Sequence, residues 1–163
     1  MCAHHPHTRG FSLIEAVVAA AVVAIGLLGI TSAYAAYVRS SASLAGSAQA
    51  MFLAEEGIES VKLMRDASWS ATVGSFTAGV PYYLYFANGT WTATTTPQPE
   101  IGGEFNRTIV FSPVNRDVNG DITGSGGTLD PNTLLATVSV AFPARAATST
   151  ITLATYVDNI FKN

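Results

Sequence analysis

The feature that most constrains this chain is an apolar run near its N-terminus that contains a single charge. From Phe11 to Val38, Glu15 is the only charged side chain. About 20 apolar residues span a bilayer as a helix, and the stretch from Ala16 to Val38 exceeds that length. A carboxylate near the centre of a membrane helix costs roughly 2.5–3.5 kcal/mol. The run therefore predicts a membrane helix in which the single acidic residue, Glu15, has a function.

The residues around Glu15 form a specific motif. A short basic leader ends at Gly10 and is followed by Phe11-Ser12-Leu13-Ile14-Glu15-Ala16. This segment resembles the cleavage and methylation signal of type IV pilins and of the pseudopilins of type II secretion. The resemblance covers residues 9–30 closely and is architectural beyond them. It implies that a prepilin peptidase cuts after Gly10 from the cytoplasmic side, methylates the new amine of Phe11, and so prepares the helix for packing in a filament core.

The same resemblance gives Glu15 a role in assembly, against the N-terminal amine of a neighbouring subunit. After cleavage Phe11 would carry a cationic amine, and Glu15 lies four residues on, about one helical turn away. Each charge alone is costly in hydrocarbon, and pairing compensates both. The alternative is a tolerated charge close to the membrane edge, whose side chain reaches the interface. The adjacent cut site favours the assembly role.

A second processing route competes with this one. Ala33-Tyr34-Ala35 fits a signal-peptidase site, and cleavage after Ala35 would release a secreted globular binding domain. The apolar run is longer than the ~7–15 residues of a secretory signal, and a carboxylate inside such a segment is unusual. We therefore favour cleavage after Gly10.

The chain as a whole predicts an α+β fold with a long N-terminal helix packed against an antiparallel sheet. We expect a leader at 1–10, a transmembrane and filament-core helix at 11–38, an amphipathic continuation at 39–66 and a β-rich head at 67–163. On the continuation, Met51, Ala54, Ile58 and Val61 recur at three and four residues and indicate the face on which the head packs.

The head should contain four or five strands. The β-branched and alternating segments lie at residues 82–87, 90–95, 108–111, 134–142 and 148–156. Asn88-Gly89 predicts a type I′ turn between the first two. Asp130-Pro131-Asn132 predicts a turn that opens the strand at 134–142.

One loop of the head offers oxygen ligands for a cation. Asp117, Asn119 and Asp121 occupy alternate positions, as in the first half of a calcium loop. The pattern then departs from that loop, because Ile122 stands at the position of the invariant glycine and Thr128 at that of the bidentate glutamate. Some pseudopilins bind calcium in a head loop, which the resemblance extends to this segment. The alternative is an Asn-Gly turn, which we favour, and we expect no other cofactor.

Composition argues against two other classes of function. Net charge is −3 and no basic tract is present, so the chain lacks the electrostatic footprint of a nucleic-acid-binding protein. All three histidines and the one cysteine precede Gly10. The mature chain would therefore have no histidine base, no cysteine nucleophile and no disulfide, and we expect it not to be an enzyme.

These features predict a structural subunit, a minor pilin or a pseudopilin, of a type IV pilus-like filament or a type II secretion pseudopilus. The resemblance implies as partners other subunits of this class, prepilin peptidase, an inner-membrane assembly platform and membrane lipid. It also implies a single-pass protein of the inner membrane with an extracytoplasmic head before assembly. After assembly the subunit would lie in an extracellular or periplasmic filament.

Overall fold

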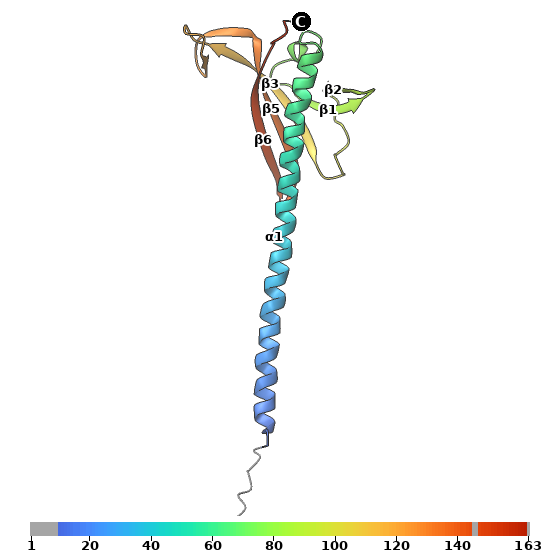
Figure 1. Ribbon diagram of the computed structural model, residues 1–163, viewed down its shortest axis with the longest axis vertical. Helices are drawn as coiled ribbons and strands as arrows, with labels where there is room; N and C mark the ends of the chain where they lie inside the picture. Colours follow the sequence, from blue (N-terminus) through green and yellow to red (C-terminus); the bar gives the residue numbers. More distant parts are fainter. Residues whose placement is uncertain (1–9, 145–146, 163) are drawn as a thin grey trace, which may run out of the picture. The chain divides into compact units, whose positions relative to one another are not determined.

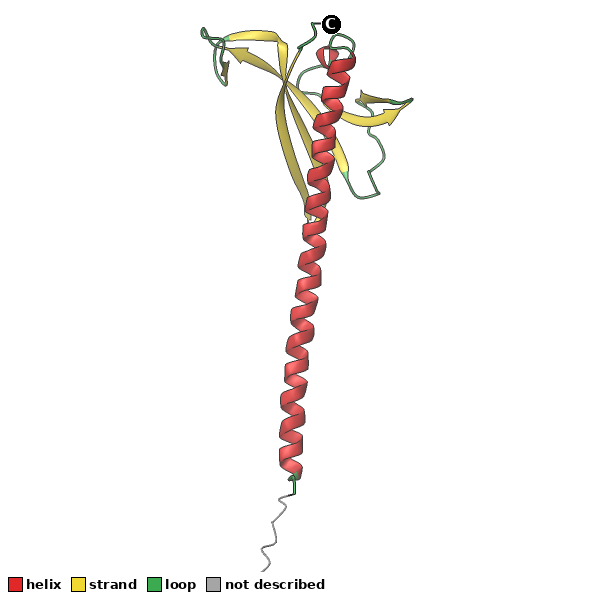
Figure 2. Ribbon diagram, viewed as in Figure 1, coloured by secondary structure: helices red, strands yellow, loops and turns green. Residues whose placement is uncertain are grey.

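The computed structural model describes residues 10–144 and 147–162, apart from the side chains of residues 42 and 43. Of the expected leader only Gly10 is among the described residues. The described chain divides into two compact units, one ending at residue 42 and the other beginning at residue 43. The elements are, in chain order, α1 (Leu13–Ala67), the short 3-10 helix η1 (Val73–Ser75), β1 (Pro81–Ala87), β2 (Thr90–Thr94), β3 (Asn106–Arg116), β4 (Ile122–Thr123), β5 (Thr128–Ala144) and β6 (Ala147–Asp158) (Figures 1 and 2).

Helix α1 begins at a capped N-terminus. The Oγ of Ser12 accepts a hydrogen bond from the backbone N–H of Glu15 at 3.3 Å, and the Ser12 carbonyl accepts one from the N–H of Ala16. A serine followed three residues later by a glutamate is the arrangement that satisfies free N–H groups at a helix start. The expected helix is confirmed and begins two residues later than Phe11.

The part of α1 in the second unit packs on one face of the sheet. Its buried apolar residues recur at three- and four-residue spacing and are Ala50, Ala54, Ile58, Val61 and Met64. The expected stripe is right in three of its four members, but Met51 is 40% exposed and Ala50 is buried in its stead. Because residues 50, 54, 57, 58, 61 and 64 share one helical face, position 51 falls on its margin.

Gly57 is the point of closest approach between α1 and the sheet. A Cβ built at this position would lie 2.8 Å from Cγ1 of Val138 on β5. Contacts this short do not occur for real side chains, so the helix can lie this close only where it carries a glycine. The sequence presents Gly57 as a modest loss of helix propensity, and the structure gives the packing reason for it.

The sheet is antiparallel, with the order β2-β1-β3-β5-β6 and with β4 paired to β3. The α+β architecture of a long N-terminal helix packed on an antiparallel sheet is therefore confirmed. The expected number of four or five strands is wrong, since the sheet has six. The additional strand, β4, has two residues, too few to give a period-two signal. The Asn88-Gly89 turn is confirmed, with φ of 52° and 78°, both positive as a type I′ turn requires.

Strand β5 begins earlier than expected and carries a bulge. Its pairing with β3 jumps from Pro113↔Leu134 to Val114↔Asp130. The Asp130-Pro131-Asn132 segment, expected to be a turn before the strand, lies inside β5 at this irregularity. A proline cannot donate to the ladder and is tolerated at a bulge, so the residues that indicated a turn are accommodated within one long strand.

Candidate functional site

The residues expected to be processed lie just before α1. Gly10 and Phe11 are exposed and non-helical, and Glu15 is the acidic residue of the first helical turn. The bond between Gly10 and Phe11 is therefore in exposed, irregular backbone, the kind of segment that proteases cut. By contrast, Ala33-Tyr34-Ala35, the alternative cut site, lies within α1.

Ser12 is a residue of this site that the sequence analysis did not single out. It is the second residue after the expected cut and caps the helix, so the first turn, which carries Glu15, is held by the chain's own side chain. The Ser-x-x-Glu spacing was the available signal. An acid in the first turn is also favoured by the helix dipole. Glu15 therefore stabilises the start of the helix, in addition to its expected pairing with the amine of a neighbouring subunit.

The surface of α1 that follows Glu15 is apolar and uncovered. Every side chain from residue 11 to residue 41 is exposed, including Ile25 at 70% and Leu28 at 68%. Among the described residues, α1 is the one helix long and apolar enough to cross a membrane. A surface of this kind requires a bilayer or other helices as its surroundings.

The expected cation loop is a tight turn between β3 and β4. The carboxylate of Asp117 accepts backbone N–H groups from Asn119 at 2.9 Å and from Asp121 at 3.0 Å, both on Oδ1. The N–H of Asp117 donates to the carbonyl of Asp121, and Gly120 has a φ of +87°. Asp117 thus holds the turn together through an Asx-type arrangement, and these hydrogen bonds lower the pKa of its carboxyl, with the Asp121 N–H contributing most.

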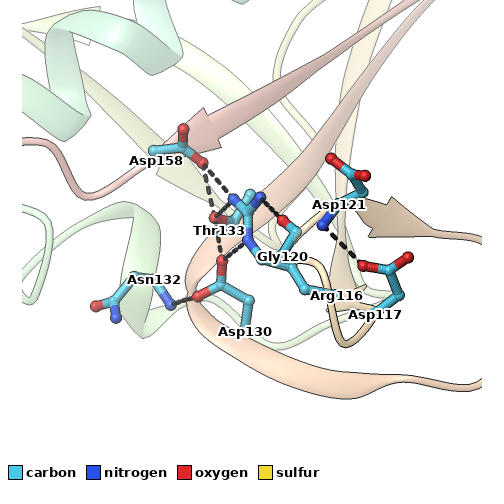
Figure 3. Close-up of polar contacts among 8 residues, drawn as sticks. All are labelled: Arg116, Asp117, Gly120, Asp121, Asp130, Asn132, Thr133 and Asp158. Carbon is cyan, nitrogen blue, oxygen red and sulfur yellow. Dashed lines mark hydrogen bonds and ion pairs between the residues drawn. The ribbon is translucent and has the colours of Figure 1, made fainter.

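Next to this turn, Arg116 joins three parts of the head (Figure 3). Its Nε donates to Oδ2 of Asp130 at 2.6 Å, its Nη1 to the carbonyl of Gly120 at 3.0 Å and its Nη2 to Oγ1 of Thr133 at 3.1 Å. Asp158, on β6, lies with its Oδ1 4.0 Å from Nη2. The cluster links the β3–β4 turn, the β5 bulge and the end of β6.

The electrostatics of this cluster follow from its hydrogen bonds. Thr133 first, then Arg116 and the N–H of Asn132, lower the pKa of Asp130 to about 2. The pKa of Arg116 is raised, chiefly by its hydrogen bond to Asp130. A carboxylate held in its charged form by two donors and a guanidinium is a structural brace.

A metal role for Asp117, Asn119 and Asp121 stays a prediction. In the part of the chain that the structure describes, no three His, Cys, Asp or Glu side chains are gathered as a metal would need. Oδ1 of Asp117 accepts two backbone N–H groups, whereas Oδ2 accepts one long hydrogen bond of 3.4 Å from Nδ2 of Asn119.

Comparison with known proteins bears on the N-terminal site. Residues 6–31 match the prokaryotic N-terminal methylation motif. This is the prepilin-type cleavage and methylation signal of type IV pilins and pseudopilins, and the match includes Gly10, Phe11 and Glu15 but does not reach the head. No curated protein and no solved structure matches the chain.

The motif and the fold together support a pilin-like or pseudopilin subunit in general. The motif is a structural one, and it implies association with other pilin subunits and with prepilin peptidase. With the apolar helix that follows, it also indicates anchoring in a membrane before assembly.

Proposed function

We propose that this chain is a minor pilin or pseudopilin that is cut after Gly10, methylated on Phe11 and assembled into a filament through α1. The observation that carries the proposal is the placement of Glu15. It is the one charge on an exposed apolar helix surface that runs from residue 11 to residue 38, and it lies in the helical turn that follows the cut site.

The apolar surface at the start of α1 needs to be covered. The side chains of residues 11–41 are exposed, and most of them are apolar. A bilayer would cover this surface before assembly, and the same helices of neighbouring subunits would cover it afterwards. Such helices associate through close van der Waals packing, for which the many alanines of residues 16–36 are well suited.

Assembly also needs a contact that fixes the axial register between neighbouring helices. Apolar packing along a helix is tolerant of register, whereas a buried charge needs its partner at one place. Cleavage creates the only cation near this end of the helix, the amine of Phe11, because the next basic residue along α1 is Arg39. Pairing Glu15 with the amine of an adjacent subunit would therefore set the axial offset between neighbours.

In this proposal the inner-membrane assembly platform draws subunits from the membrane, and the head is displayed on the extracytoplasmic side, in a periplasmic or extracellular filament. The described head has a core of its own built from α1 and the sheet. We infer a minor rather than a major subunit because this core has no disulfide to reinforce it.

The test is the mass and N-terminal sequence of the mature protein from cells that make it. A chain beginning with N-methylated Phe11 would support the proposal. A chain beginning at residue 36 would overturn it in favour of a secreted globular domain released by signal peptidase.

A matched pair of variants sharpens this test. Gly10→Leu should accumulate as an uncut precursor in the membrane, because the residue before the cut must be small. Gly26→Leu is the control, since both glycines have open space around them and only the first borders the cut bond. Equal maturation of the two variants would contradict the cut-site assignment.

Calcium binding by the 117–121 turn is a separate hypothesis. We expect none, because Oδ1 of Asp117 already accepts the two backbone N–H groups that hold the turn, and because the sequence departs from a calcium loop at Ile122 and Thr128. Calorimetric titration of the purified chain with Ca²⁺ would test this, with Asp117→Asn as the control. A saturable heat that the substitution abolishes would establish the site.

A further inference from the structure

An apolar cavity of about 550 Å³ lies beside the sheet of the head. It is walled by Leu63, Met64 and Ala67 at the end of α1, by Phe86 of β1, and by the consecutive residues 89–93 of the β1–β2 turn and of β2. A cavity over one face of a strand is lined by alternate residues, because successive side chains point to opposite faces. Lining by consecutive residues therefore places this cavity along the free edge of β2, and we call the cavity and that edge the edge groove.

The free edge of β2 carries backbone groups that lack a partner. The residues that flank a two-residue turn, here Ala87 and Thr90, bond to each other, and along an antiparallel ladder every second residue then points its N–H and C=O toward the partner strand. Under the register of β1 and β2, Trp91 and Ala93 point theirs away from β1. No hydrogen bond reaches these groups from the residues that the structure describes. The edge groove is thus bordered by two free donors and two free acceptors.

These two features together specify the kind of ligand. A row of free N–H and C=O groups on a sheet edge is matched by the backbone of an extended peptide, and a pocket beside the edge selects one of its side chains. The pocket here is apolar, so the selected side chain is a large apolar one. A small apolar molecule would use the cavity alone, whereas a peptide uses the cavity and the edge.

One segment of the described head offers both an apolar side chain and a free backbone. Outside helices and strands, the exposed large apolar residues of the described head are Val118, Ile160 and Phe161. Val118 lies in the turn that the Asp117 carboxylate closes with its hydrogen bonds. Ile160 and Phe161 lie in the irregular segment 159–162 that follows β6, and they are 56% and 59% exposed. Within the described residues, no backbone hydrogen bond involves Phe161.

The segment 159–162 cannot enter the edge groove of its own head. Strands β2 and β6 are the two edges of the main path of the sheet, with β1, β3 and β5 between them (Figure 1). Neighbouring strands lie about 4.8 Å apart, so β2 and β6 are separated by about 19 Å. An extended chain advances about 3.4 Å per residue, so Phe161 reaches only about 10 Å beyond Asp158, where β6 ends. The segment can therefore fill only the edge groove of another molecule.

We propose that the edge groove binds the segment 159–162 of a second copy of this chain. Phe161 would fill the cavity, and the backbone of the segment would pair with Trp91 and Ala93 as an added strand. Two different surfaces meet in this contact, so it is heterologous and can continue from copy to copy. The proposal rests on the proposed function in one respect, since assembly through α1 would hold the heads of adjacent copies together.

The contact should be weak between free molecules. A segment of four residues buries far less than the ~1,200–2,000 Å² of a stable protein interface. Two heads that are held together by their α1 helices are present to each other at an effective concentration in the mM range. A weak contact is populated at that concentration, so the edge groove would join neighbouring heads once their helices have packed.

The first test is titration with a peptide of residues 158–163, blocked at both ends. The protein is the chain that begins at Phe11, in a zwitterionic detergent, and the signal is the fluorescence of Trp91, which borders the cavity. We expect a saturable change at peptide concentrations up to the mM range, and at least tenfold weaker binding of the same peptide with Phe161→Ser. No saturable change, or equal binding of the two peptides, would overturn the proposal.

A matched pair of protein variants shows where the peptide binds. Leu63→Ser removes an apolar wall of the cavity, and we expect it to weaken binding of the peptide at least fivefold. Leu44→Ser is the control, because both leucines are on α1 and exposed, at 57% and 68%, and only Leu63 lines the cavity. Both variants should melt within a few degrees of the wild type. Equal weakening, or none in either variant, would mean that the peptide binds elsewhere and would overturn the proposal.

Cross-linking tests whether the segment comes from a second copy. The one cysteine of the sequence lies in the expected leader, so engineered cysteines would be the only ones in the mature chain. Ala93→Cys and Lys162→Cys are placed on separately tagged chains, which are mixed and treated with a short bismaleimide. We expect at least tenfold more mixed dimer than when Thr152→Cys, at an exposed site of β6, replaces Ala93→Cys. Equal yields would overturn the proposal, as would cross-linking only when both cysteines are in one chain.

Failure here and failure of the filament assignment are distinguishable. If the peptide does not bind but the mature protein begins with N-methylated Phe11, the filament assignment stands and the contact between heads is wrong. If the peptide binds and cross-linking succeeds but the mature protein begins at residue 36, the edge groove joins secreted heads and the filament assignment is wrong.

Discussion

The two parts of α1 have different relations to the rest of their own chain. From residue 11 to residue 41 every side chain is exposed, although most are apolar. From Ala50 to Met64 a regular stripe is buried, with Ala54 and Val61 at 0% exposure. One continuous helix therefore carries a segment whose partners are in the same chain and a segment whose partners must be supplied from outside. Both segments have hydrophobic surface. They differ because only the second has a sheet of the same chain to pack against.

The largest expected effect comes from the one charge in the uncovered part. Glu15→Val should leave membrane insertion intact, because it removes a cost of roughly 2.5–3.5 kcal/mol from a membrane helix. It should nevertheless abolish filament incorporation, because the amine of the adjacent subunit loses its partner. Incorporation is measured by immunoblotting of sheared filament fractions against membrane fractions.

Glu55→Val is the control for that substitution. Glu55 is an exposed acid on the part of α1 that belongs to the head, so its loss should leave incorporation unchanged. If Glu15→Val enters filaments as well as Glu55→Val does, Glu15 has no part in assembly.

The next effect concerns the ion pair that joins α1 to the sheet. Arg107, whose side chain is 3% exposed, donates from Nη1 to Oε2 of Glu56 and to the carbonyl of Leu53, and it lies 5.2 Å from the centre of the Trp91 ring. Removing the acid leaves a buried guanidinium short of one acceptor. Glu56→Ala should lower the free energy of unfolding of the head by about 2 kcal/mol, measured by urea denaturation followed through tryptophan fluorescence.

Glu59→Ala provides the comparison at an exposed ion pair. Glu59 binds Lys62 at 2.7 Å on the solvent side of the helix, and its loss should cost no more than about 0.5 kcal/mol. Equal losses in the free energy of unfolding for the two variants would mean that burial of Arg107 does not make its ion pair more important for stability.

A smaller effect, with opposite signs at two glycines, probes the packing itself. Gly46→Ala should raise the free energy of unfolding by about 0.5–1 kcal/mol, because the nearest side-chain atom is 3.7 Å from the added Cβ. Gly57→Ala should lower it by about 1 kcal/mol, since overpacking against Val138 outweighs the gain in helix propensity. Thermal melts of the two variants side by side would show this, and stabilisation by both would rule out the close approach.

The smallest effect is a dependence of stability on acid. The pKa of Asp130 is lowered to about 2 in the folded head, below the ~3.9 of an unfolded chain. The stabilisation it gives is therefore complete above about pH 4 and is lost as the pH falls toward 2. The melting temperature of the wild type should fall more steeply over that pH window than the melting temperature of Asp130→Asn. If the two pH profiles are parallel instead, the Asp130 carboxylate does not brace the β5 bulge.

Much of this fold follows from local patterns in the sequence. The long helix, the Asn88-Gly89 turn and the strands at the C-terminus are each predicted by composition and periodicity, because helices and hairpins satisfy their hydrogen bonds nearby. The motif at Gly10 and Glu15 is likewise local, and the family comparison supports it.

What the patterns missed depends on contacts between distant residues. The bulge at Asp130 is set by the register against Val114, and the inward direction of Arg107 depends on Glu56 of the helix. Ser12 is the exception. Its capping partner, Glu15, is only three residues away, so the Ser-x-x-Glu spacing was enough to predict the cap.

The dependence of the α1 stripe on β5 also sets the order in which the head can form. A ribosome delivers Ala54 and Gly57 long before Val138, so the helix is complete while the strand that covers it is still unmade. Contacts of such long sequence separation form slowly, and transiently exposed apolar surface is prone to premature association. This delay defines an interval during which the apolar stripe of the helix is uncovered and offers a binding surface to a chaperone.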